Sequence, residues 1–197
     1  FLVPEPNEFV IAIWTAIFVG VVTQLFASIT SGVSGDFDVI QVVSLAKEDV
    51  GVDIWEWIHG ECRKSCVPWC VVAAIVAVEV NERPAWMRLF ERVCARVTLQ
   101  RITMSFGVTQ ESSKRVLTDK ESVRLTIRWV ADNLSEEAKK LLLCKREIKD
   151  LDERLRWHSS IEKANSEVKA LADLRNPDGR YGEMVARVCW SLFHGYV

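Results

Sequence analysis

Residues 71–79 read Val-Val-Ala-Ala-Ile-Val-Ala-Val-Glu, eight apolar residues followed by one acid, Glu79. A helix that is apolar on all sides is buried in a protein core or a membrane, so this run predicts a central helix around which the fold is built. Burial against such a run disfavours the ionised carboxylate and would raise the pKa of Glu79. The alternative is that Glu79 marks the solvated end of this helix, which is the commoner place for an acid.

A second apolar stretch occupies residues 9–29 and contains no charged residue. As a helix it would extend about 30 Å, which is the thickness of the hydrocarbon core of a bilayer. No basic region precedes it, so it does not read as a cleavable signal peptide. We therefore expect residues 1–36 to form a transmembrane helix and linker, with membrane contact through residues 9–29. The competing interpretation, which Thr15, Thr23 and Gln24 allow, is a helix buried in a homo-oligomer or against a membrane-protein partner.

Composition excludes several classes of function. The 197-residue chain has a net charge of −2, so no overall basic field directs it to nucleic acid. It contains neither a P-loop nor a dinucleotide-binding glycine pattern, and we expect no cofactor. His59, His158 and His194 are far apart in the sequence and no nucleophile motif accompanies them, which argues against a hydrolytic triad.

The cysteines form no CxxC pair, and their pairing cannot be deduced from spacing alone. The six positions are Cys62, Cys66, Cys70, Cys94, Cys144 and Cys189. The helical spacing of His59, Cys62 and Cys66 allows a shared metal, but Pro68 interrupts the helix before Cys70. We therefore expect small buried side chains and no metal site.

Helical patterns fill most of the remaining chain, which predicts an all-α domain over residues 37–197. Gly51 is expected to end a helix, Thr118 and Glu121 form a capping box, and Ser135 is expected to cap the helix that follows. Residues 101–112 mix β-branched residues with glycine and read as an extended segment or loop. The expected helices are 38–50, 53–65, 68–80, 85–99, 122–134, 136–157, 160–174 and 181–193.

Three short motifs then occur in a recognisable order. Glu79 lies within Ala-Val-Glu-Val-Asn, residues 105–110 read Ser-Phe-Gly-Val-Thr-Gln, and Arg-Asn-Pro at 175–177 precedes Tyr-Gly-Glu-Met-Val at 181–185. Over about residues 53–197 this order resembles the lysozyme-like superfamily of lytic transglycosylases and goose-type lysozymes. In that family a helix ends in the catalytic glutamate, a loop reads Gly-Leu-Met-Gln, and a Tyr-Asn pair precedes a helix carrying Tyr and Val.

The resemblance implies a membrane-tethered glycosidase, a lytic transglycosylase or muramidase, with Glu79 as its catalytic general acid. Such an acid must hold its proton near neutral pH to protonate the departing sugar oxygen. The implied partner is the glycan strand of peptidoglycan, which places the domain in the periplasm or outside the cell. The substrate-binding residues that the resemblance implies are Ser105, Gly107, Gln110, Asn176 and Tyr181.

The chain also departs from the family pattern. Thr109 stands where the loop usually has an apolar residue, and Arg175 replaces the tyrosine before the asparagine. A hydrolase needs a second carboxylate, and Glu82, Glu91 and Glu111 are candidates that the sequence does not separate. A transglycosylase needs only one, because the substrate's own 6-hydroxyl attacks, so the single clear acid favours transglycosylase.

The alternative function is a non-enzymatic, membrane-associated interaction or glycan-binding protein on a degenerate lysozyme-like fold. Cysteines without an evident pairing favour it, because oxidising compartments usually pair them. A cytosolic placement would suit this alternative and would keep the domain away from peptidoglycan.

Overall fold

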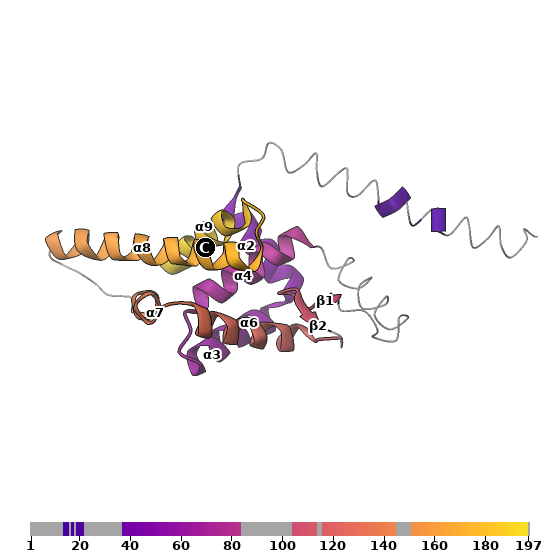
Figure 1. Cartoon of the computed structure of the whole chain (residues 1–197), viewed down its shortest axis with the longest axis horizontal. Coiled ribbons are helices and arrows are strands. Elements are labelled where there is room, and N and C mark those ends of the chain that lie inside the picture. The colour runs from indigo at the N-terminus through magenta and orange to yellow at the C-terminus, as the bar shows by residue number, and fades with distance from the viewer. Residues whose placement is uncertain are drawn as a thin grey trace, which may run out of the picture. The chain divides into compact units, whose positions relative to one another are not determined.

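The structure, a computed structural model, describes residues 14, 15, 17, 19–21, 37–83, 104–113, 116–144 and 151–196 (Figure 1). The chain divides into two compact units, Phe1–Phe37 and Asp38–Val197. The second unit is almost wholly helical, which confirms the predicted all-α class of the domain. It contains the candidate site.

In the part of the chain that the structure describes, no helix combines the length and the apolar character that crossing a membrane requires. The predicted span, residues 9–29, lies largely outside the described residues. Those described within it, 14, 15, 17 and 19–21, are helical and exposed. The membrane helix therefore stays a prediction.

The helix α4, Trp69–Glu82, lies at the centre of the second unit, and every residue from Cys70 to Val80 is buried. This confirms the central helix and excludes the alternative that Glu79 marks a solvated helix end. Helices from both halves of the unit pack directly on α4. They are α2 Val39–Val50, α3 Val52–Lys64, α6 Asp119–Asn133 and α9 Tyr181–His194. Because α4 has no polar face, only enclosure of this kind removes its whole surface from water.

Helix ends follow the local chemistry of the sequence. Gly51 ends α2 with φ +89°, and the carboxylate of Asp38 caps its start by accepting from the N–H of Ile40 at 2.9 Å. Thr118 and Glu121 form the predicted capping box of α6, and Ser135 caps α7, Glu136–Leu143. These predictions are confirmed because each cap involves residues only a few positions apart.

The two charged helices differ from prediction. We expected helices over 136–157 and 160–174, but α7 ends at Leu143 and α8 runs without a break over Leu151–Arg175. The expected gap between Trp157 and Ser160 is helical, and the hydroxyl of Ser160 donates to the carbonyl of Arg156 at 3.0 Å within α8. α8 packs against α9, and α7 packs against α8.

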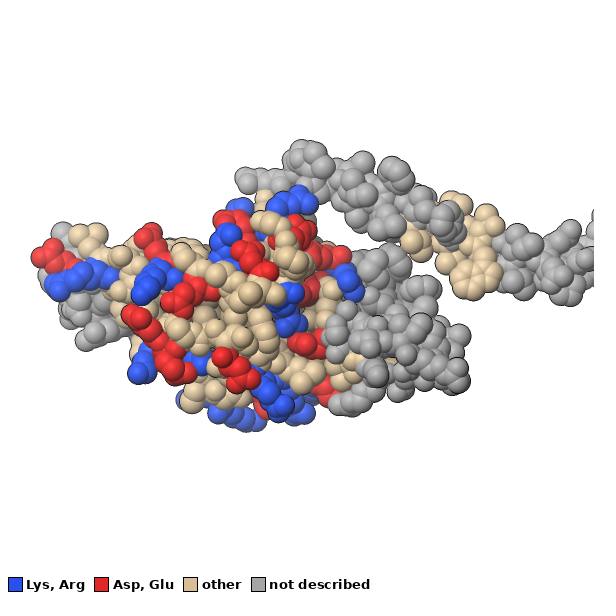
Figure 2. Space-filling view, viewed as in Figure 1, with Lys and Arg blue, Asp and Glu red and all other residues tan. Residues whose placement is uncertain are grey.

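Acidic and basic side chains are interspersed on the face shown in Figure 2. Several form exposed ion pairs, such as Lys169 with Asp173 at 3.1 Å and Lys163 with Glu137 at 3.8 Å. Exposed pairs of this kind contribute at most about 1 kcal/mol each. Surface charge is therefore a minor part of what holds these helices together.

The segment predicted as extended or loop forms a small hairpin. Strand β1, Met104–Phe106, pairs antiparallel with β2, Glu111–Ser113, with Phe106 opposite Glu111. In the connecting turn, Gly107 has φ +74° and Gln110 has φ +53°. Gly107 also lies against α6: a Cβ atom there would be 2.2 Å from Oγ of Ser122.

We predict that Gly107→Ala destabilises the protein by about 2–4 kcal/mol, because it adds both a left-handed backbone penalty and a steric clash. Gly60→Ala is the matched control. Gly60 lies inside α3 with nothing within 4 Å of its Cβ position, so alanine there should stabilise by about 0.5–1 kcal/mol. Urea unfolding measures both changes, and equal midpoints for the two variants would contradict this account of the turn.

Candidate active site around Glu79

Glu79 and Tyr181 form the centre of the site. Glu79 lies near the end of α4 and is 4% exposed, and Tyr181 is the first residue of α9 and is 0% exposed. The hydroxyl of Tyr181 donates to Oε1 of Glu79 at 2.7 Å, although the two residues are 102 positions apart in the chain. The contact therefore exists only because α4 and α9 pack side by side.

The pKa of Glu79 is raised above its ordinary value of 4.5, and desolvation by burial is the largest cause. The hydrogen bonds from Tyr181 and Gln110 and the positive charges of Arg175 and Arg83 all act in the opposite direction, but they do not offset the desolvation. Burial also raises the pKa of Tyr181, and the negative charge of Glu79 adds to this. Tyr181 therefore remains a hydrogen-bond donor over the whole physiological range.

Arg175 connects three parts of the site. From the end of α8 its Nη2 lies 2.7 Å from Oε1 of Glu111 and also donates to the backbone carbonyl of Thr109. Its Nε lies 3.8 Å from Oε1 of Glu79, and its guanidinium is 5.2 Å from the centre of the Trp129 ring on α6. With its side chain 12% exposed, Arg175 supplies a nearly buried positive charge between two carboxylates.

Glu111 is the acid that shares the guanidinium of Arg175 with Glu79. Its Oε1 accepts from Arg175 and, at 2.9 Å, from the hydroxyl of Thr126 on α6. The sequence did not separate Glu111 from Glu82 and Glu91 as a second carboxylate. Glu111 contacts the same guanidinium as Glu79, whereas Glu91 lies outside the described residues.

Glu82 lies one helical turn beyond Glu79 and is exposed. Desolvation of its carboxyl, followed by the negative charges of Glu79 and Asp178, raises its pKa to about 7.

Two of the substrate-binding residues implied by the resemblance lie beside the acid. Tyr181 donates to Glu79, and the side chain of Gln110 hydrogen-bonds to it. Gly107 shapes the hairpin turn that presents Gln110. These contacts bring together residues that the sequence linked only through the order of its motifs.

Of the remaining two residues, only Asn176 has a described side chain, and it makes no contact with Glu79. Ser105 lies in β1 opposite Ser112, and its side chain is outside the description. Asn176 closes a turn instead, since its Oδ1 accepts from the N–H of Asp178 at 3.2 Å. The role of either residue toward a sugar therefore stays a prediction.

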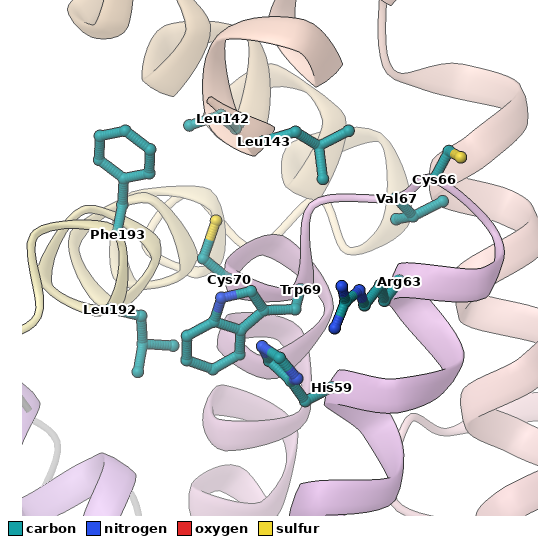
Figure 3. Close-up of a pocket in the computed structure, with 10 residues that line it drawn as sticks. All are labelled: His59, Arg63, Cys66, Val67, Trp69, Cys70, Leu142, Leu143, Leu192 and Phe193. Atoms are coloured by element: carbon teal, nitrogen blue, oxygen red, sulfur yellow. The ribbon is translucent and has the colours of Figure 1, made fainter. Parts of the chain in front are cut away.

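The open groove that the resemblance implies at Glu79 is not seen among the described residues, because the carboxyl is enclosed by Tyr181, Gln110 and Arg175. Residues 84–103, which follow α4, lie outside the description. A cavity of about 400 Å³ is present near the other end of α4, lined by residues of α3, α4, α7 and α9 (Figure 3). Within the described ranges, no group of three or more His, Cys, Asp or Glu side chains is arranged to hold a metal ion.

Sequence reasoning missed Arg175, which it noted only as a departure from the family pattern. The available signal was the position of an arginine immediately before the Asn-Pro turn, at the end of a helix. Comparison with known proteins found no family model, curated protein or solved structure that matches the chain.

We predict that Thr109→Val stabilises the protein by about 1 kcal/mol. The hydroxyl of Thr109 is buried and has no hydrogen-bond partner among the described residues, so valine removes a desolvated polar atom without changing the shape. Thr126→Val is the matched control, because that threonine is equally buried but hydrogen-bonded to Glu111. It should destabilise by about 1–3 kcal/mol in the same thermal or urea unfolding experiment. If Thr126→Val were more stable than Thr109→Val, the conclusion that the Thr109 hydroxyl is the one without a partner would be wrong.

We also predict that Glu79→Gln makes the protein more stable at neutral pH. The folded-state pKa of Glu79 is raised, so the folded state holds more protons than the unfolded state above about pH 4.5. Wild-type stability therefore falls as pH rises from there to the folded-state pKa, by about 1.4 kcal/mol for each unit of elevation. Thermal unfolding at about pH 4 and about pH 8 should show that Glu79→Gln is more stable than the wild-type protein, and that the difference in stability is larger at the higher pH. A gain that shrinks as pH rises would mean that Glu79 is stabilised as the anion.

Proposed function

We propose that the second unit is a lysozyme-like glycosidase that cleaves the glycan strands of peptidoglycan, with Glu79 as its general acid. The observation that carries the proposal is the buried Glu79 carboxyl, with a raised pKa, held by Tyr181 beside Gln110. Glycosidic bonds need an acid that is still protonated near neutral pH, and burial is the usual way to obtain one.

The hydrogen bonds of the site determine which oxygen of Glu79 carries the proton. Tyr181 donates to Oε1, and the Nε of Arg175 faces the same oxygen. The hydrogen bond from Tyr181 and the nearby positive charge both disfavour a proton on Oε1, so the neutral acid carries it on Oε2. That proton passes to the glycosidic oxygen as its bond to the anomeric carbon breaks. The hydroxyl of Tyr181 then stabilises the carboxylate that is left.

The environment of Glu111 favours a transglycosylase over a hydrolase. A hydrolytic partner must bind a water or attack the sugar, and Glu111 could do so only through Oε2, because its Oε1 already accepts from both Arg175 and Thr126. In a transglycosylase the 6-hydroxyl of the cleaved sugar attacks its own anomeric carbon. The carboxylate of Glu79 takes the hydroxyl proton, so one acid serves both steps and is regenerated.

We place this unit outside the cytoplasm, tethered to the membrane through residues 9–29, because peptidoglycan is found there. The uncharged, apolar sequence of residues 9–29 supports the tether.

We predict that the wild-type protein releases soluble muropeptides with 1,6-anhydro ends from purified sacculi, and that Glu79→Gln lowers the initial rate about 100-fold or more. The wild-type rate should fall as pH rises through the raised pKa of Glu79, because the protonated acid is then depleted. Mass spectrometry of the released fragments measures both effects.

Glu183→Gln is the matched control, since Glu183 is an exposed carboxylate in the first turn of α9. It should keep the wild-type rate. Equal rates for Glu79→Gln and Glu183→Gln would contradict the proposal, and release of reducing ends in place of anhydro ends would make the enzyme a muramidase.

One observation favours a second function, a glycan-binding or interaction protein without catalysis. Glu79 is only 4% exposed and has Arg175 within ion-pair distance, as a purely structural network would. If the protein binds glycan without cleaving it, the wild-type protein sediments with sacculi but releases no fragments, and Glu79→Gln sediments equally well. The same sample therefore distinguishes binding from cleavage.

A further inference from the structure

Three buried cysteines lie close together at the end of α4 opposite Glu79. Cys70 is in the first turn of α4 and is 1% exposed, and Cys189 of α9 and Cys62 of α3 are both 0% exposed. Cys70 and Cys189 lie near enough to each other that Cys70 helps to raise the pKa of the Cys189 thiol, and Cys70 has a similar effect on the thiol of Cys62. The Cys70–Cys189 pair joins α4 to α9.

The position of this pair follows from the packing of the two helices. Glu79 of α4 meets Tyr181 of α9, and Cys70 meets Cys189, so the helices are antiparallel with the acid at one end and the thiols at the other. α4 packs more extensively on α9 than on any other described element. A disulfide between the two helices requires Cβ atoms about 3.5–4.5 Å apart.

The cavity gives a reagent access to one of these thiols. Cys70 lines it together with Trp69, Leu142 and Phe193, and Figure 3 shows the sulfur of Cys70 directed into this space. Arg63 also lines it and places a positive charge there. At about 400 Å³ the cavity lies within the size range of small-molecule sites. Cys189 and Cys62 are not among its lining residues.

We propose that Cys70 and Cys189 are a dithiol site that a small anionic disulfide, such as oxidised glutathione, converts to a disulfide between α4 and α9. The Cys70 thiolate attacks one sulfur of the reagent, forms a mixed disulfide and releases one glutathione thiolate. Cys189 then loses its proton and attacks the sulfur of Cys70, which releases the second glutathione. The protein loses two electrons and two protons, and one glutathione disulfide becomes two molecules of glutathione. The inference goes beyond the proposed glycosidase and does not depend on it.

The test treats the folded, reduced full chain with oxidised glutathione, then alkylates the free thiols, digests the protein and maps the linked peptides by mass spectrometry. We expect one intramolecular link between the peptides of Cys70 and Cys189. The oxidised protein should unfold at a temperature roughly 5–15 °C above that of the reduced protein. The disulfide would close the long chain segment between Cys70 and Cys189 into a loop, which lowers the entropy of the unfolded chain.

Two variants make the result specific. Cys66→Ser replaces the exposed thiol that also lines the cavity and should leave the Cys70–Cys189 link unchanged. Cys62→Ala should leave it unchanged as well, because Cys62 is the buried neighbour that the link does not use. A link between Cys62 and Cys70, or a wild-type protein in which Cys70 and Cys189 both remain open to alkylation after unfolding, would overturn the proposal. Neither readout involves glycan cleavage, so an inactive Glu79 does not affect the outcome.

Discussion

The contact between the buried carboxyl of Glu79 and the hydroxyl of Tyr181 is the interaction on which the rest of this structure depends. A carboxyl group 4% exposed on an otherwise apolar helix is costly unless a partner satisfies it. Tyr181 is that partner only when α9 lies along α4, and the packing of the two helices places it there. The same packing sets Cys70 against Cys189 at the opposite end. One helix pair therefore positions both the acid and the thiols.

Arg175 is the second constraint, because it determines how charge is distributed around that contact. A single guanidinium, stacked over Trp129, lies between Glu79 and Glu111. It is closer to Glu111, at 2.7 Å against 3.8 Å, so its positive charge chiefly compensates Glu111. Glu79 is consequently left with too little compensation to overcome its burial, and its pKa stays raised. This unequal distance gives Glu79 and Glu111 different electrostatic environments. In enzymes, such a difference is what allows one carboxyl group to act as an acid while another stays ionised.

The features that could be predicted from sequence were those set by residues close together in the chain. The apolar run before Glu79 could belong only to an enclosed helix, and the capping box of Thr118 and Glu121 spans a single turn. The proximity of Gln110 and Tyr181 to Glu79 was implied only by the order of the motifs in the lysozyme-like resemblance. Arg175 contacts Glu111 across 64 positions, and no local pattern encodes such a contact. The gap expected between Trp157 and Ser160 was wrong: α8 is continuous there, and the hydroxyl of Ser160 bonds to the carbonyl of Arg156 within the helix.

The central claim is that burial makes the carboxyl of Glu79 harder to ionise than that of an ordinary glutamate, so its pKa is raised. The most direct measurement is a carbon-detected NMR titration of its side-chain carboxyl, assigned by comparison with Glu79→Gln. The account predicts a titration midpoint above the ordinary value of 4.5, which moves higher still in Tyr181→Phe because that hydrogen bond lowers the pKa. A midpoint at or below 4.5 would mean that Arg175 and Tyr181 hold Glu79 as the anion, and the account of it as an acid would be wrong.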